Sequence, residues 1–112
     1  MYMIESIIKP SSIDPIKAKL ASLGILGMTA LECKGFGKQK GHTERYRGGR
    51  MDVGFVPKVM LKVAVKAEDL DKAVEAVTSA ARTGNVGDGK VFVYAVAKVV
   101  RIRTGEADND AL

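Results

Sequence analysis

The sequence has very little of several residue types that mark particular classes of protein. It holds one cysteine, one histidine and no tryptophan among 112 residues. A single cysteine, Cys33, excludes an internal disulfide framework and is expected in a reducing compartment. No apolar run approaches the roughly 18–20 residues of a transmembrane helix, and the first residues lack the pattern of a signal peptide. We therefore expect a cytoplasmic protein that does not itself insert into a membrane.

The same scarcity argues against an enzyme. His42 lies in a glycine-rich stretch where a preorganised base is not expected, and Cys33 falls in a predicted strand without a histidine partner. No cysteine and histidine spacing of a metal site is present. We predict no catalytic residues and interpret the chain as a binding and switching module.

Charge and aromatic content narrow the choice of partner. The 18 basic and 13 acidic residues give a formal net charge of +5, which suits anionic partners such as nucleic acid, lipid headgroups or phosphorylated small molecules. Only three tyrosines and three phenylalanines are present, and none is interleaved with a basic stripe on a strand. A nucleic-acid partner is therefore not expected.

Hydrophobic periodicity predicts two helices and four strands. The strands are expected at 2–9, 27–34, 59–66 and 91–97, the last being apolar on both faces and therefore placed at the centre of the sheet. One helix is expected from Asp14, as N-cap, to a stop at Gly24, and the second from about Glu68 to Ala81. Residues 98–103 are expected to extend the last strand or to form a short further one.

This order predicts a single α+β domain over residues 1–112, of the ferredoxin-like split βαβ type (β-α-β-β-α-β). Its antiparallel sheet carries both helices on one face. The apolar character of residues 91–97 suggests that the other face is covered by further copies of the chain.

A stretch from Gly35 to Pro57 fits no core element. Recurrent glycines prevent a helical or alternating pattern, and a structureless segment of this length inside a domain is usually functional or disordered. Two acids, Glu44 and Asp52, oppose its five cations. We interpret it as an arm that contacts a partner. The cations are Lys38, Lys40, Arg45, Arg47 and Arg50.

A second glycine-rich stretch, Thr83 to Lys90, has a backbone suited to wrapping around a phosphate, although it lacks the spacing of a Walker A loop. Taken alone it also fits a plain helix-to-strand turn. Arg101 and Arg103 lie two apart, so on an extended chain both point to one face, where an anion or a carboxylate is needed between them. Lys58, which begins the strand after the arm, is an ion-pairing candidate or a solvated strand-end lysine.

Three motifs together resemble the PII family of nitrogen-regulatory signal-transduction proteins over essentially the whole length. The arm signature is K-G-F-G-K-Q-K-G-H-T-E-R-Y-R-G at 34–48, the second loop reads T-G-N-V-G-D-G-K at 83–90, and R-I-R-T-G-E occupies 101–106. The resemblance implies a homotrimer with nucleotide sites between subunits, an arm called the T-loop (37–55), a B-loop (82–90) and a C-terminal loop (101–112).

The ligands implied by the resemblance are ATP or ADP, Mg²⁺ and 2-oxoglutarate, with Gln39 also on the magnesium. The implied partners are nitrogen-metabolism targets such as enzymes and an ammonium transporter, contacted through the T-loop. The nucleotide residues that match are Ile7, Met28, Thr29, Gly35, Gly37, Lys38, Gln39, Ala64, Gly87, Asp88, Gly89, Lys90, Arg101 and Arg103, the two arginines coming from a neighbouring subunit. Those matching the 2-oxoglutarate site are Gly37, Gln39, Lys40, Gly41, Lys58 and Gly87; those expected on the partner are Arg45, Tyr46, Arg47, Arg50 and Met51.

Several positions depart from the family pattern. Met51 stands where relatives carry a modifiable tyrosine, so we expect no uridylylation, and Gly49 replaces a serine phosphorylated in some relatives. Lys62 replaces a usual glutamate near the nucleotide and Lys38 a usual arginine. These changes leave open a related sensor with another metabolite input, such as bicarbonate, in carbon-linked or transporter regulation. Slow incidental ATP hydrolysis and nucleic-acid binding are less favoured interpretations.

Overall fold

The sheet is organised around β3 (Val56–Val65), the strand with the clearest alternation in the sequence. In the computed structural model, which describes residues 1–37 and 54–112, its odd-numbered residues from 59 to 65 are all buried. The intervening Met60, Lys62 and Ala64 are only half-buried, because they lie on the opposite face of the strand. The period of two therefore predicted both the strand and the face that enters the core.

Four strands form one antiparallel sheet in the order β2-β3-β1-β4. β1 (Tyr2–Ile8) lies in the middle and pairs with β3 on one side and β4 (Gly89–Ala95) on the other, while β2 (Thr29–Gly35) forms the far edge. This confirms the predicted α+β fold with an antiparallel sheet.

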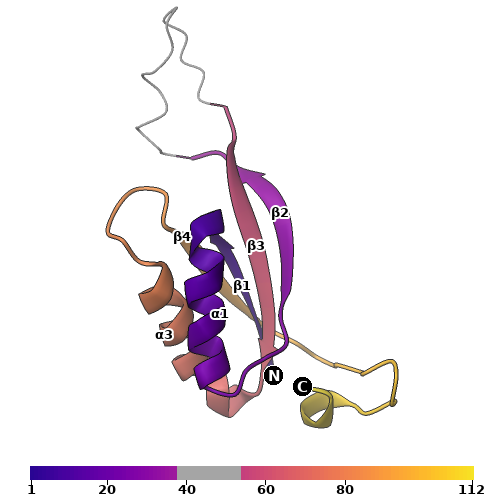
Figure 1. Cartoon of the computed structure of the whole chain (residues 1–112). Helices are drawn as coiled ribbons and strands as arrows, with labels where there is room; N and C mark the ends of the chain where they lie inside the picture. The colour runs from indigo at the N-terminus through magenta and orange to yellow at the C-terminus, as the bar shows by residue number, and fades with distance from the viewer. Residues whose placement is uncertain (38–53) are drawn as a thin grey trace, which may run out of the picture.

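Two helices cover one face of the sheet (Figure 1). α1 spans Ile13–Ser22 and α3 spans Leu70–Ala81, and each follows a short 3-10 turn, Pro10–Ser12 and Ala67–Asp69 respectively. No helix in the described part of the chain is long and apolar enough to cross a membrane. Between helices and sheet lies the core, built mainly from aliphatic side chains: Ile4, Ile8, Ile16, Leu20, Val59, Leu61, Val63, Val65, Ala73, Ala76, Val77 and Ala81.

The start of α1 differs from the sequence prediction. The helix begins at Ile13 with Ser12 as N-cap, so Asp14 lies within the first turn and is not the cap. The reason is the preceding 3-10 turn: Ile13 already has helical backbone angles (φ −59°, ψ −52°), and the turn runs directly into the helix. Gly24, with φ +82°, ends the helical segment as predicted.

The position of β4 also corrects a prediction. It is an edge strand and pairs only with β1 among the described strands. Phe92, Val93 and Tyr94 are 47%, 41% and 44% exposed within the single chain. An apolar strand indicates burial, but the pattern does not say whether the covering surface comes from the same chain.

The face of the sheet opposite the helices is covered, among the described residues, only at one end, where the C-terminal segment lies. The paired residues Leu31 and Met60 lie on it together with Phe92 and Tyr94, because directly opposed residues of antiparallel strands share a face. The Tyr94 hydroxyl donates a hydrogen bond to Glu5 on the same face, which raises the pKa of Tyr94. This face therefore carries exposed apolar groups beside charged ones, because the pairings also place Lys62 and Lys90 on it.

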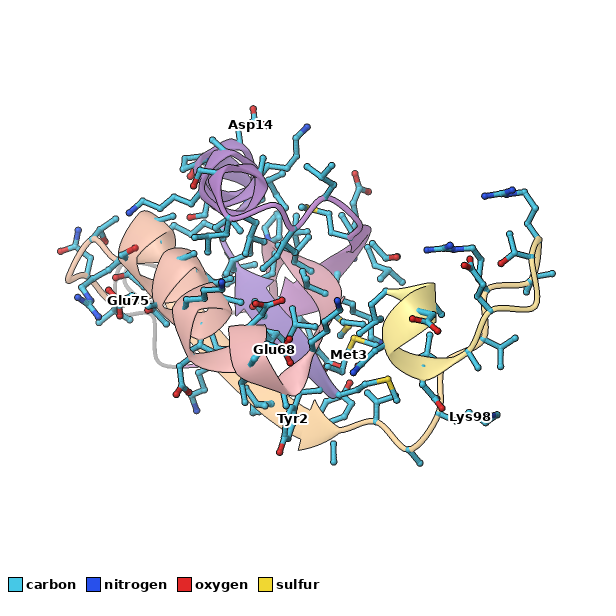
Figure 2. All side chains as sticks on the ribbon, turned by 90° about the horizontal axis from the view of Figure 1, so that it is seen from below. Tyr2, Met3, Asp14, Glu68, Glu75 and Lys98 are labelled. Carbon is cyan, nitrogen blue, oxygen red and sulfur yellow. The ribbon has the colours of Figure 1, made fainter. Side chains whose placement is uncertain are left out.

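The segment after β4 folds back on itself, so residues 98–103 neither extend that strand nor form a further one, contrary to the prediction from the sequence. Val100 forms an isolated bridge with Ala107, and the amide of Arg101 donates to the carbonyl of Glu106 at 2.8 Å. A 3-10 turn, Asp108–Ala111, follows. Figure 2 shows this C-terminal turn beside Met3, away from the two helices.

Candidate functional site

One group of the predicted site residues gathers at the end of the sheet where β2 stops and β3 begins. Ile7 pairs with Lys90 on one side and Met60 on the other, and Gly35 pairs with Val56. The loop that precedes β4 ends at the same edge, since Gly89 pairs with Ile8. We call this group the loop-end cluster: Ile7, Gly35, Gly37, Lys58, Gly87, Asp88, Gly89 and Lys90.

Lys58 is the buried cation of this cluster. Lys58 is only 8% exposed, and its Nζ donates a 2.8 Å hydrogen bond to the carbonyl oxygen of Gly87. The aliphatic stem lies over Gly35, where an added Cβ would come within 3.1 Å of Lys58 Cγ. Within residues 1–37 and 54–112, Lys58 forms no ion pair with a carboxylate. A buried ammonium next to a carbonyl favours an anionic ligand, and the expectation of a solvated strand-end lysine is wrong.

The glycine-rich loop before β4 approaches the sheet very closely. Gly89 has φ +105°, and a Cβ built on it would lie 1.9 Å from the carbonyl oxygen of Ile7. Only glycine fits there, both sterically and conformationally. The loop is therefore held against β1 at the point where β4 begins.

Asp88 makes most of the polar contacts of this loop. Its carboxylate accepts from the amide and hydroxyl of Thr83, at 2.7 and 2.5 Å, and from the amide of Gly84 at 2.9 Å. Lys9 Nζ lies 3.2 Å from the same carboxylate. Hydrogen bonding to the Thr83 hydroxyl, with the Thr83 and Gly84 amides and Lys9, holds the pKa of Asp88 well below its usual range.

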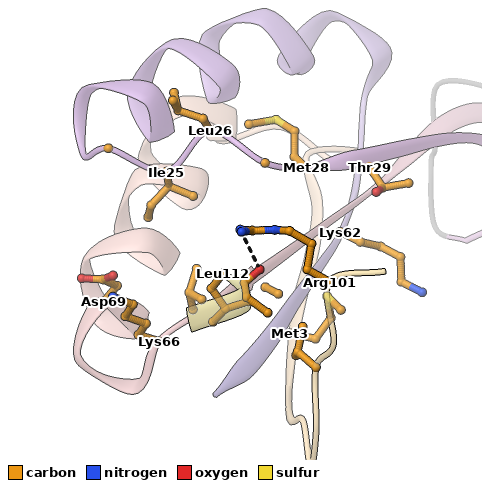
Figure 3. Close-up of a pocket in the computed structure, with 16 residues that line it drawn as sticks. Met3, Ile25, Leu26, Met28, Thr29, Lys62, Lys66, Asp69, Arg101 and Leu112 are labelled. Carbon is orange, nitrogen blue, oxygen red and sulfur yellow. Dashed lines mark hydrogen bonds between the residues drawn. The ribbon is translucent and has the colours of Figure 1, made fainter. Parts of the chain in front are cut away.

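A second group of predicted residues lines a cleft at the other end of the sheet. The cleft has a volume of about 790 Å³ and lies between the start of β2, the end of β3 and the C-terminal segment (Figure 3). We call it the C-terminal cleft. Its walls include the predicted residues Met28, Thr29, Ala64 and Arg101, and also Lys62.

Arg101 in the C-terminal cleft already has protein partners. Nη1 lies 2.5 Å from Glu106 Oε1, and Nη2 donates to the carbonyl oxygen of Ala111 at 3.3 Å. The expectation that Arg101 and Arg103 share one face of an extended chain is wrong, because the segment turns sharply here. Arg103 is exposed and does not line the cleft. The carboxylate that the sequence argument required beside Arg101 is supplied by Glu106.

Within one chain the two groups do not meet. Lys58 of the loop-end cluster and Ala64 of the C-terminal cleft lie six residues apart on β3, about 20 Å at the usual rise of a strand. The candidate residues thus fall into two separate groups: Met28, Thr29 and Ala64 lie apart from Ile7 and Gly35, although the resemblance to the PII family implies that all five lie around the adenosine.

Several predicted residues lie outside the described part of the chain. They include the candidate magnesium ligand and all five partner-contact residues, and their predicted roles remain predictions. These residues are Lys38, Gln39, Lys40, Gly41, Arg45, Tyr46, Arg47, Arg50 and Met51.

The residues that hold the candidate binding side chains in place were not predicted from the sequence. Thr83 and Lys9 hold Asp88, and Glu106 holds Arg101. Thr83 and Asp88 at the two ends of a glycine-rich turn are a recognisable signal, because both side chains readily bond to nearby backbone. Lys9 carried no comparable signal, since only strand pairing brings it beside the loop.

Comparison with known proteins places the chain in a family. The family model described as "Nitrogen regulatory protein P-II" matches residues 1–106. A nitrogen regulatory protein P-II of Pasteurella multocida is 51% identical over 112 residues, and one of Rhizobium etli is 50% identical. The nitrogen regulatory protein P-II 1 of Escherichia coli K12 is also 50% identical, and each match covers the whole of both chains. A family model over residues 1–106 and relatives about half identical over the full length show that the chain belongs to the nitrogen regulatory protein P-II family.

Proposed function

We propose that the chain is a trimeric, non-enzymatic sensor of ATP or ADP and 2-oxoglutarate that regulates nitrogen-metabolism targets. The observation that carries this proposal is the division of the candidate residues into two half-sites about 20 Å apart on β3. In this proposal, neither half-site is by itself a complete ligand site. In a closed ring of copies, the loop-end cluster of one subunit faces the C-terminal cleft of its neighbour, and each contact completes one site.

The face of the sheet opposite the helices supports such a ring. Phe92 and Tyr94 on β4 and Leu31 on β2 are 44–47% exposed in the single chain. Apolar side chains on both edges of one sheet face are the surface expected where further copies pack. Covering this face also accounts for the apolar character of β4 on both sides.

The chemistry of the two half-sites suits a nucleotide and a small dicarboxylate. The C-terminal cleft offers the apolar Met28 and Ala64 for a base, with Arg101 and Lys62 for anionic groups. The loop-end cluster offers the ammonium of Lys58 and the glycine-rich backbone before β4. The described residues hold no group of three or more histidine, cysteine or acidic side chains placed for a metal, so Mg²⁺ would arrive with the phosphates, with Gln39 as the candidate protein ligand.

The output of the sensor is the arm, residues 37–55, whose two roots lie at the loop-end cluster. Phe36 and Phe55 pack against each other at these roots, with ring centroids 5.6 Å apart and the ring planes tilted by 54°. A ligand bound at Lys58 or Gly87 makes different contacts with different conformations of the arm. Only such differences in contact can shift the populations of those conformations. We propose that this selects among the targets of a cytoplasmic protein, which include enzymes and an ammonium transporter, and that Met51 leaves the arm without uridylylation.

Calorimetric titration of 2-oxoglutarate, with and without Mg-ATP, tests this function. We expect binding only when Mg-ATP is present, and its loss in Lys58→Ala and Gln39→Ala. Lys72→Ala, an exposed lysine on α3, is the matched control and should bind normally. Binding of ATP and ADP without any response to 2-oxoglutarate would instead indicate another metabolite input, and bicarbonate is then the first anion to titrate.

A further inference from the structure

The carboxylate of Asp88 is already saturated with protein donors. Three hydrogen bonds reach it from Thr83 and Gly84, and Lys9 forms an ion pair at 3.2 Å. The side chain of Asp88 is 22% exposed. A carboxylate with this many donors has little capacity left for a ligand, and its negative charge opposes any phosphate that approaches it.

The same contacts close the loop into a fixed ring. Asp88 near the end of the loop accepts a hydrogen bond from Thr83 at the start of the loop, and the Asp88 amide donates to the carbonyl of Asn85 at 3.3 Å. The Thr83 hydroxyl in turn accepts from the Asn85 amide at 3.2 Å. Lys58 fixes the carbonyl of Gly87, so the loop is also tied to β3.

The ring leaves backbone donors for a ligand. Among the described residues, the amides of Val86 and Gly87 donate no hydrogen bond to the protein, and Val86 is 61% exposed. Adjacent free amides in a turn form a concave anion-binding surface. Their direction depends on the ring that Thr83 and Asp88 close.

We propose that Asp88 is a positioning residue that does not contact the nucleotide. Together with Thr83 it holds residues 83–88 in the shape that presents the Val86 and Gly87 amides to a phosphate, while Lys9 compensates its charge. This inference rests on the proposed nucleotide function. Asp88 is then not a residue that binds the phosphate itself but one that holds the phosphate-binding amides in place.

Two substitutions at Thr83 form a matched pair for the test. Thr83→Val removes the hydroxyl at nearly constant volume, whereas Thr83→Ser keeps it. Calorimetric titration with ATP and, separately, with ADP should show affinities about tenfold weaker for Thr83→Val and near wild type for Thr83→Ser. Asp88→Asn should also weaken both nucleotides, and by the same factor, because the loop and not a particular phosphate is affected.

The outcomes separate the inference from the function on which it rests. Wild-type protein that binds neither nucleotide overturns the proposed function and this inference together. Wild-type protein that binds both, with Thr83→Val unchanged, overturns the inference alone. Tighter binding by Asp88→Asn also overturns it, since that result means that the carboxylate faces the phosphates directly. Thermal unfolding of each variant checks folding, and the Thr83 pair still decides the question if Asp88→Asn does not fold.

Discussion

The loop-end cluster and the C-terminal cleft are built in opposite ways. In the loop-end cluster, the ammonium of Lys58 is buried and bonded to a backbone carbonyl, and Gly89 lies in contact with β1. In the C-terminal cleft, Arg101 is paired with a side chain, Glu106, and both side chains of the pair are more than one third exposed. The first region is fixed by the backbone and the second by exchangeable side-chain contacts.

Under the proposed function, this difference indicates how the two half-sites would divide the work of binding. A fixed group of donors costs little reorganisation when a ligand arrives, so the loop-end cluster provides geometry. An arginine held by a solvent-accessible carboxylate can exchange that partner for a phosphate, so the cleft provides adjustable charge. Substitutions in the two regions should therefore change the free energy of unfolding by different amounts and in different directions.

The largest effect is expected for Gly89→Ala. The new Cβ would lie 1.9 Å from the carbonyl oxygen of Ile7, and φ +105° disfavours any residue with a side chain. Overpacking and backbone strain together predict a loss of at least about 3 kcal/mol in the free energy of unfolding. Urea unfolding at a fixed protein concentration measures it.

Gly84→Ala is the matched control within the same loop. Gly84 also has a positive φ, +89°, but a Cβ there meets nothing within 4 Å. Only the backbone term remains, so the expected loss is about 1–2 kcal/mol. Equal losses at Gly84 and Gly89 would mean that the loop moves away from β1 without cost, and the loop-end cluster is then not fixed.

A smaller effect of opposite sign is expected for Lys58→Met. Methionine keeps the apolar stem over Gly35 and removes a buried ammonium whose partner among the described residues is a neutral carbonyl, so the cost of burying that charge is removed with it. We expect the free energy of unfolding to rise by about 1 kcal/mol in ligand-free protein, measured by the same urea titration.

Lys62→Met provides the comparison from the C-terminal cleft. Lys62 is only half-buried, so its replacement should change the free energy of unfolding by less than about 0.5 kcal/mol. A loss of stability in Lys58→Met would show that the bond to Gly87 serves the fold and not the ligand.

The sequence predicted the parts of this comparison that depend on local pattern. The alternation of β3 placed Lys58 and Lys62 on the correct strand, and the glycines of 83–90 marked the loop correctly. Burial of Lys58 was not predictable, because it depends on β2 bringing Gly35 under the lysine stem. The alternation of Arg101 and Arg103 did not predict the turn at Arg101, because the chain reverses at Gly105, where φ is +77°.

A similarly small effect is expected for Glu106→Gln in the C-terminal cleft. An ion pair between side chains as exposed as Arg101 (37%) and Glu106 (46%) contributes about 0–1 kcal/mol, because water screens the attraction and ordering both side chains opposes it. We therefore expect a loss of less than about 1 kcal/mol in urea unfolding, shrinking further at about 1 M salt, where the screening length is about 3 Å.

The pair between Lys72 and Asp69 calibrates this prediction, because it joins two partly exposed side chains at 3.2 Å, and Lys72 itself does not line the C-terminal cleft, although Asp69 does. Lys72→Met should change stability by the same small amount with the same salt dependence. A loss above about 2 kcal/mol confined to Glu106→Gln would mean that Arg101, Glu106 and Ala111 brace the C-terminal segment as part of the fold. Arg101 would then not be free to exchange its carboxylate for a phosphate, and the contrast between a fixed and an adjustable half-site would no longer hold.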